Sequence, residues 1–178
     1  MEYQEIIDRR RALVIEPYKS LADVGFDGPW VTPYQITSKS AEGPVFVACT
    51  GWMNPRSLKI GRRCKLRDTC PASGSTPIDA ALALRGLNRK NIYVTQTFHL
   101  IPATRSERIS PAAVRRSFDE VTFFELQGSQ VVALGDVAAD ECKRRDLPHV
   151  AVCHPSRRGY SNEQNAAEIA DAIRALGF

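Results

Sequence analysis

Residues 130–153 read QVVALGDVAADECKRRDLPHVAVC. Two short apolar runs, Gln130–Leu134 and His149–Cys153, enclose a segment, Val137–Arg145, that we expect to be a helix. Both runs are rich in β-branched residues and too short to be buried helices, which is typical of strands. The stretch therefore predicts a strand, a helix and a second strand, the unit from which parallel sheets are built.

The same alternation extends toward the amino terminus. Pro44–Cys49 and Asn91–Thr95 are two further apolar runs, and their near-continuous apolar character indicates strands buried on both faces. Capping residues, helix-starting prolines and terminal glycines predict the remaining helices. We expect these helices over about Glu2–Val14, Thr76–Gly86, Ser110–Leu126 and Ser161–Leu176, with an irregular stretch over Glu16–Gly43. The predicted fold is α/β, a three-layer sandwich with a four-stranded parallel sheet between helices.

Length and composition are those of an ordinary globular protein. The 178 residues predict a single domain over 1–178, and 43% apolar with 25% charged residues excludes disorder and collagen-like classes. No apolar run reaches the ~20 residues of a membrane helix, and the acidic opening of the chain lacks a secretory signal, so we expect no membrane partner. The five cysteines are then expected to be reduced thiols in the cytoplasm.

Polar residues follow three of the four predicted strands. Asn54 follows the first strand, Gln96 the second and His154 the fourth. Ligands of parallel sheets bind beyond the carboxyl ends of the strands, so these side chains are the candidates for a site. No glycine-rich phosphate loop, nucleophile elbow or metal-ligand spacing is present, and we expect no metal and no cofactor.

Two of these strand ends carry a resemblance to a known family. Gly51-x-x-Asn54-Pro55 and His154-Pro155-Ser156 resemble the two signature motifs of the uracil-DNA glycosylase superfamily, above all its single-strand-selective and mismatch-specific branches. Asn91–Gln96 and Val131–Gly135 are similar to strand segments of the bacterial branches. The resemblance runs from about Pro44 to the end of the chain and implies the fold of that superfamily, a four-stranded parallel sheet between helices.

The resemblance implies a base pocket and catalytic roles. His154 would stabilise negative charge on the departing base, while Asn54 would position the attacking water or contact the base. Gln96 would read the edge of the base, with a side chain one methylene longer than the asparagine usual in the family. Each of the three also has a purely structural interpretation. His154 could be packed in a loop, Asn54 could begin an Asn-Pro turn, and Gln96 could be a solvated strand end. The implied base-binding residues are Gly51, Trp52, Met53, Gln96 and Phe98.

Basic and polar segments near these motifs predict contacts with DNA phosphates. The net charge is +4, and arginines cluster in two of the loops. The start of a helix near residue 76 offers backbone N–H groups, and the loop after residue 156 corresponds to the family's duplex-entering loop. A solvated charge run is the alternative interpretation. The candidate DNA-binding residues are Arg62, Arg63, Lys65, Ser75, Thr76, Ser156, Arg157, Arg158 and Tyr160.

The sequence also departs from the family pattern. Arg56 replaces the glycine usual after Asn-Pro, Gln96 replaces the asparagine, and Arg157 replaces the usual proline. No Cys-x-x-Cys occurs near the amino terminus, so we expect no iron–sulfur cluster. These departures concern the substrate more than the fold.

The leading prediction is a monomeric DNA-base glycosylase of base excision repair. It would flip uracil or a modified pyrimidine out of single-stranded or locally opened DNA and hydrolyse its N-glycosidic bond. One alternative is a protein of the same fold that binds or modifies bases or nucleotides without hydrolysis. Another is a hydrolase of free nucleosides or nucleotides. The expected location is the cytoplasm, including the nucleoid or a phage-infected bacterial cell.

Overall fold

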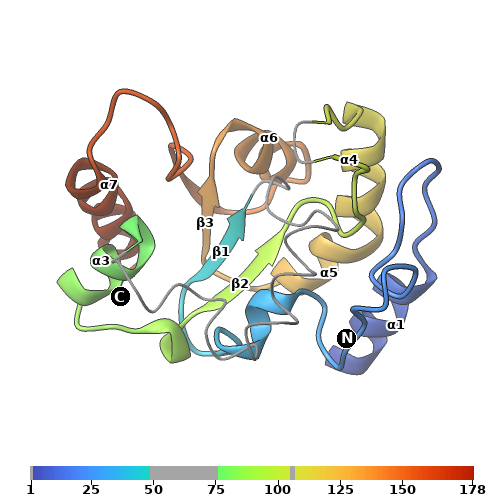
Figure 1. Cartoon of the computed structure of the whole chain (residues 1–178). Helices are drawn as coiled ribbons and strands as arrows, with labels where there is room; N and C mark the ends of the chain where they lie inside the picture. Colours follow the sequence, from blue (N-terminus) through green and yellow to red (C-terminus); the bar gives the residue numbers. More distant parts are fainter. Residues whose placement is uncertain (1, 49–75, 105–106) are drawn as a thin grey trace.

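The computed structural model describes residues 2–48, 76–104 and 107–178. Its centre is a sheet of four parallel strands, ordered β2-β1-β3-β4 (Figure 1). The strands are β1 (Val45–Ala48), β2 (Tyr93–Gln96), β3 (Val131–Leu134) and β4 (His149–Val152). These are the four runs predicted from the sequence, with small shifts at their ends. The predicted parallel sheet is confirmed.

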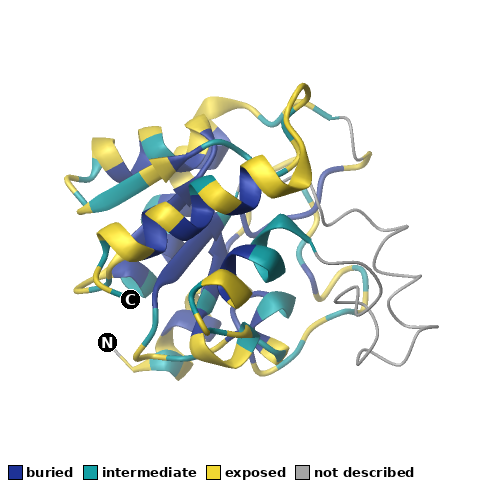
Figure 2. Cartoon of the chain, turned by 90° about the vertical axis from the view of Figure 1, so that its left-hand side faces the viewer, coloured by how far each residue is buried: buried dark blue, intermediate teal, exposed yellow. Residues whose placement is uncertain are grey.

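Helices cover both faces of the sheet, as Figures 1 and 2 show. The α- and π-helical segments are α1 (Tyr3–Ala12), α3 (Pro77–Leu84), α4 (Pro111–Ser117), η3 (Phe118–Thr122), α5 (Phe123–Leu126), α6 (Asp136–Arg144) and α7 (Asn162–Ala175). Two short 3₁₀ turns are η1 (Pro33–Ile36) and η2 (Arg89–Asn91). Within the described ranges, none of these helices has the length and apolar character needed to cross a membrane.

The core divides into two layers because strand side chains alternate between faces. Phe46 and Val132 pack on one face with residues of α3 and α7. Val47 and Val131 pack on the other face with residues of η3, α5 and α6. This alternation gives the helix–sheet–helix arrangement expected from the sequence.

The predicted helix starts are confirmed by their caps. The Thr76 hydroxyl accepts the Asp79 N–H at 3.2 Å, and Pro77 is the first residue of α3. At α7, the Ser161 hydroxyl accepts the Gln164 N–H at 3.2 Å, while the Gln164 side chain accepts the Ser161 N–H at 2.9 Å. Such caps satisfy N–H groups that have no partner inside the helix.

The segment predicted as one helix, Ser110–Leu126, is helical but not uniform. Its middle is the π-helical η3, in which the Phe123 N–H bonds to the Phe118 carbonyl five residues earlier. A π turn adds one residue to the helical turn and changes the direction of the side chains that follow it.

The stretch predicted to be irregular, Glu16–Gly43, contains η1 and two isolated antiparallel bridges, Lys19 to Ile101 and Lys39 to Tyr93. Apolar residues of α1 pack with Phe98 and Leu100, which follow β2, and with Val121 of η3. The amino-terminal region therefore lies against the segment that follows β2.

Candidate functional site

The strand order defines a switch point at the carboxyl edge of the sheet. From β1 the chain goes to β2 on one side and later to β3 on the other side. Ligands of open parallel sheets bind at such a point. Gln96 ends β2, Gly135 follows β3, and His154 lies just past β4. The segment after β1 lies outside the described residues.

Gln96 is a buried amide with an unused donor. The residue is 4% exposed, and its Nε2 has no hydrogen-bond partner in the described part of the chain. A buried donor without a partner costs about 1–3 kcal/mol, so such groups in folded proteins usually have a reason. The amide is therefore a candidate for contact with a ligand.

His154 packs closely against Gly135. Gly135 has a φ of +91°, which side chains rarely adopt. A Cβ at this position would lie 3.2 Å from the Cβ of His154. Glycine is thus required for the backbone conformation and for the close approach of the histidine to the end of β3.

The hydrogen bonding of His154 defines its available donor. The Ser156 N–H donates to His154 Nδ1 at 3.2 Å. A nitrogen that accepts a hydrogen bond carries no proton, so the neutral ring has its proton on Nε2. Burial lowers the pKa of His154 below its ordinary value of 6.5, which favours this neutral form. His154 can therefore donate a hydrogen bond from Nε2 without carrying charge.

The loop after His154 is tied to α7. Arg157 Nη2 pairs with Glu168 Oε2 at 2.8 Å, and Nη1 contacts the Cys153 sulfur. The same guanidinium lies 3.2 Å from the centre of the Tyr160 ring. Glu168 also accepts the Cys153 N–H at 3.0 Å. The charge predicted to bind phosphate at Arg157 is thus already paired within the protein.

The other described DNA-binding candidates differ in their accessibility. Ser156, Arg158 and Tyr160 are exposed. The Thr76 hydroxyl caps α3, donates to Asp79 Oδ2 at 2.6 Å and accepts from Arg89 at 3.2 Å. Thr76 is thus occupied by structural bonds, and its contact with DNA stays a prediction.

Phe98, expected to contact the base, is 1% exposed. Its ring meets that of Tyr18 edge-on, with the centroids 4.9 Å apart. Phe98 therefore fills the core beside α1, and a base could reach its face only if this packing opened.

The remaining candidates lie in the segment 49–75, outside the described residues, and stay predictions. They are Gly51, Trp52, Met53, Asn54, Arg62, Arg63, Lys65 and Ser75.

Gln96 and His154 stand at opposite sides of the switch point. Gln96 is in register with Ala48, Ala48 with Leu134, and Leu134 with Val152. Three spacings of about 4.8 Å separate the ends of β2 and β4 by about 14 Å. The two residues therefore follow strands on either side of the switch point, separated by the width of the sheet.

A buried polar cluster, which sequence reasoning missed, lies beneath the end of β2. Its centre is Glu125 of α5, whose side chain is fully buried. Glu125 Oε1 accepts from Tyr93 at 2.6 Å and from Gln35 at 2.8 Å, and Oε2 accepts from Thr95 at 2.5 Å. His99 Nε2 lies 3.7 Å from Oε2.

The two titratable groups of this cluster are shifted in opposite directions. Burial raises the pKa of Glu125 to about 7, although bonds from Thr95, Tyr93 and Gln35 oppose the shift. Burial, with the nearby charge of Arg10, lowers the pKa of His99 to about 3. His99 is therefore neutral at pH 7, while Glu125 gains or loses its proton near that pH.

One local signal for this cluster exists in the sequence. Glu125 stands between Phe124 and Leu126, and apolar neighbours are unusual for an exposed glutamate. Its donors, in contrast, are about 30 and 90 residues away along the chain, and no spacing rule connects them.

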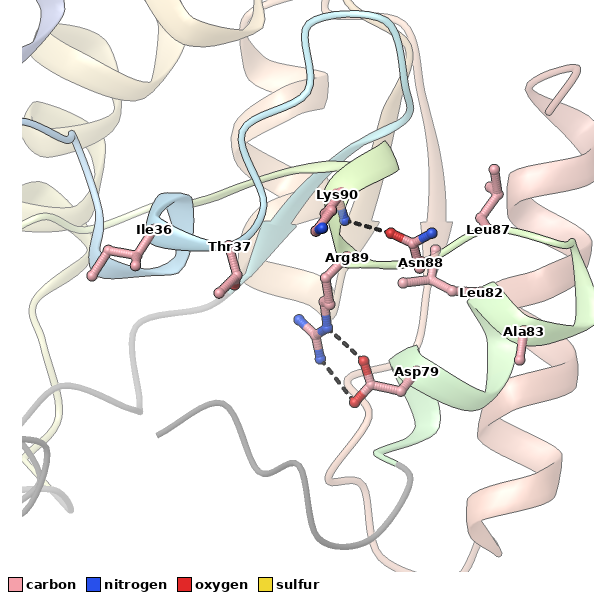
Figure 3. A pocket seen from close by; sticks show the side chains of 9 residues that line it. All are labelled: Ile36, Thr37, Asp79, Leu82, Ala83, Leu87, Asn88, Arg89 and Lys90. Carbon is pink, nitrogen blue, oxygen red and sulfur yellow. Dashed lines mark hydrogen bonds and ion pairs between the residues drawn. The ribbon is translucent and has the colours of Figure 1, made fainter. Parts of the chain in front are cut away.

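A separate pocket opens between η1, α3 and η2 (Figure 3). Its volume is about 590 Å³, and Leu82 and Leu87 contribute apolar walls. Arg89 and Asp79 form an ion pair of 2.6 Å in it. Because η2 directly precedes β2, the pocket borders the amino-terminal end of that strand, away from Gln96 and His154.

Comparisons with known proteins assign no family. No protein-family model matches the chain, and no curated protein matches its sequence. Among the residues that the structure describes, no three His, Cys, Asp or Glu side chains are grouped so that they could hold a metal ion. The site must therefore be interpreted from its own chemistry.

Proposed function

We propose that the protein is a DNA-base glycosylase that hydrolyses the N-glycosidic bond of uracil or a modified pyrimidine. One observation carries the proposal: Gln96, whose Nε2 has no partner among the described residues, and His154, whose Nε2 is a donor, follow strands at the same carboxyl edge, at the switch point of a parallel sheet. The fold itself is shared by proteins of many functions, and the proposal therefore depends on this pair of donors.

The chemistry of base removal needs donors of this kind. Breaking the bond leaves positive charge on the sugar and negative charge on a carbonyl oxygen of the base. A fixed donor at such an oxygen is worth about 3–4 kcal/mol in rate terms. His154 Nε2 supplies the donor without charge, and the Gln96 amide binds a second polar atom of the base. Asn54 would position the water.

Phosphate contacts would come from basic side chains near the carboxyl edge of the sheet. Arg157 is paired with Glu168, so we assign its role to holding the loop, and Arg158, which is exposed, contacts the backbone of the DNA. Arg62, Arg63 and Lys65, which lie outside the described residues, are the further candidates from the segment that follows β1 in the sequence. Binding should then weaken as salt increases, because phosphate contacts release counterions.

The test is release of free base from single-stranded oligonucleotides that carry uracil, other modified pyrimidines or normal bases, read as alkali-labile sites. We expect one base to be released, and His154→Ala to slow the release by about 100-fold or more. His149→Ala is the matched control, because His149 is the first residue of β4 and so lies at the amino-terminal end of that strand, away from the candidate site.

Three outcomes would contradict the proposal. Release that survives both His154→Ala and Asn54→Ala would exclude the mechanism. Binding of oligonucleotides without any abasic product would favour a protein that holds bases without hydrolysing them. Turnover of free nucleosides alone would favour a nucleoside hydrolase.

A further inference from the structure

The π turn η3 lies against the end of β2. In an α-helix, residues five apart, such as Ser117 and Thr122, point about 140° away from each other. The bond from the Phe123 N–H to the Phe118 carbonyl closes a wider turn between them. Ser117 and Thr122 consequently reach the same short segment, Gln96–His99.

Both contacts are enclosed by the protein. The Thr122 hydroxyl donates to the Gln96 carbonyl at 2.7 Å, and the Ser117 hydroxyl accepts the His99 N–H at 2.9 Å. Ser117 and Thr122 are each 0% exposed. Since Thr122 gives its only proton to Gln96, it can only accept from His99 Nε2, which lies 2.9 Å away.

The hydrogen bond from Thr122 to the Gln96 carbonyl lies on the side of β2 that has no neighbouring strand in the sheet. β2 is an edge strand, with β1 on one side. Thr97 uses that side, because its N–H donates to the Ala48 carbonyl at 3.0 Å. The Gln96 carbonyl points the other way and is held by Thr122. The last residue of β2 is thus fixed by the helix layer as well as by the sheet.

We propose that Thr122 is a positioning residue, which fixes the backbone of Gln96 so that the Gln96 amide meets the base at one defined place. The inference rests on the proposed function, because it concerns the residue that would read the base. It predicts that the Thr122 hydroxyl controls base selectivity only through the Gln96 side chain.

The test is a double-mutant cycle with Thr122→Val and Gln96→Ala. Gln96→Ala keeps the backbone carbonyl, so the loss of stability caused by Thr122→Val should be equal in both backgrounds. Selectivity is the ratio of kcat/KM for the preferred base to that for the next base. Thr122→Val should lower this ratio at least about tenfold in the wild-type background, since small misplacements cost large factors. It should not lower the ratio further in Gln96→Ala.

Rescue and control variants sharpen the result. Thr122→Ser keeps the hydroxyl and should restore the ratio, whereas Thr95→Val removes a buried hydroxyl of the same strand that bonds to Glu125 and should leave the ratio unchanged. If Thr122→Val does not fold, Thr122→Ala takes its place. An unchanged ratio in the variant lacking the hydroxyl, or an equal drop in both backgrounds, would overturn the inference.

A second measurement does not need activity. In the ¹⁵N-labelled full chain, the side-chain NH₂ signals of Gln96 are identified by their loss in Gln96→Ala. They should move in Thr122→Val and return in Thr122→Ser. If they do so while no base is released, the proposed function fails and the positioning stands. If base is released but Thr122→Val changes neither the Gln96 NH₂ signals nor the selectivity ratio, the positioning role of Thr122 is wrong and the proposed function stands.

Discussion

Gly135 brings the end of β3 against His154, and the geometry of the candidate site depends on this single contact. Its positive φ disfavours any side chain, and a Cβ 3.2 Å from His154 would force the histidine to shift by a few tenths of an ångström. His154 in turn depends on Ser156, whose N–H selects the tautomer. The candidate site therefore depends on the identity of single residues such as Gly135 and His154, and not only on their polarity.

Gly135→Ala should therefore impair the site more than the fold. Gly128→Ala is the matched control, because Gly128 also has a positive φ but nothing lies within 4 Å of its missing Cβ. Gly128→Ala should lose about 1–2 kcal/mol of unfolding free energy from backbone strain. Gly135→Ala should lose at least as much, because its φ of 91° and ψ of 165° lie in a region that is almost exclusive to glycine. Only Gly135→Ala should also slow base release, about tenfold or more. Equal rates in the two variants, measured beside chemical denaturation, would contradict this assignment.

The protonation of His154 makes a second prediction. Its pKa is lowered by burial, so the imidazole signal should titrate with a midpoint below 6.5 in NMR spectra. The rate of base release should rise with pH through that same midpoint and then level off, because the neutral ring is the active form. A rate that falls as the ring loses its proton would show that the charged form acts.

At the scale of elements, the loop after β4 is held by α7 through Glu168. One carboxylate receives the Cys153 N–H and the Arg157 guanidinium, and Arg157 stacks on Tyr160. The η3 turn holds β2 in a comparable manner. Both ends of the candidate site are thus positioned by helices packed on opposite faces of the sheet.

Glu168→Ala should release this loop. We expect a loss of about 1 kcal/mol in unfolding free energy, since the ion pair is partly exposed and only the bond to the backbone is sheltered. Base release should fall as His154 loses its support. Asp171→Ala breaks an exposed ion pair with Arg174 in the same helix and should change neither quantity measurably. If the two variants behave alike in thermal unfolding and in activity, the loop does not depend on α7.

At the scale of the whole molecule, the Glu125 cluster contributes to the pH dependence of stability in two opposite directions. The folded protein holds the Glu125 proton up to about pH 7, whereas the ordinary pKa is 4.5, so stability falls as pH rises through this window. His99 acts oppositely: its folded pKa is about 3 against 6.5, so stability falls as pH drops below 6.5. Between pH 4.5 and 6.5 the two effects oppose each other.

Glu125→Gln removes one of these opposing effects. Relative to the wild-type protein, the variant should gain on the order of 2–3 kcal/mol of unfolding free energy as pH rises from 4.5 to 7. Glu120→Gln, an exposed neighbour in η3 whose side chain is 43% accessible, is the control and should show no such trend. A difference between Glu125→Gln and wild type that does not change with pH would show that folding does not raise the pKa of Glu125.

Sequence reasoning predicted the sheet, its parallel direction and the helix starts because these depend on local features such as the Val-rich runs and the caps at Thr76 and Ser161. It missed η3, since the extra residue of a π turn leaves no mark in the apolar spacing. It also missed the pairing of Arg157 with Glu168 and the cluster around Glu125. These arise when distant segments pack together, and no local pattern records them.

The most direct test of the account is where a nucleobase binds. A single-stranded oligonucleotide carrying the best substrate base, titrated into the ¹⁵N-labelled full-length His154→Ala variant, should shift the backbone amides of Gln96, Gly135 and Arg158. Those of Asn88 and Lys90, in the pocket at the other end of β2, should not move. Shifts confined to Asn88 and Lys90 would contradict a base site at the carboxyl edge of the sheet.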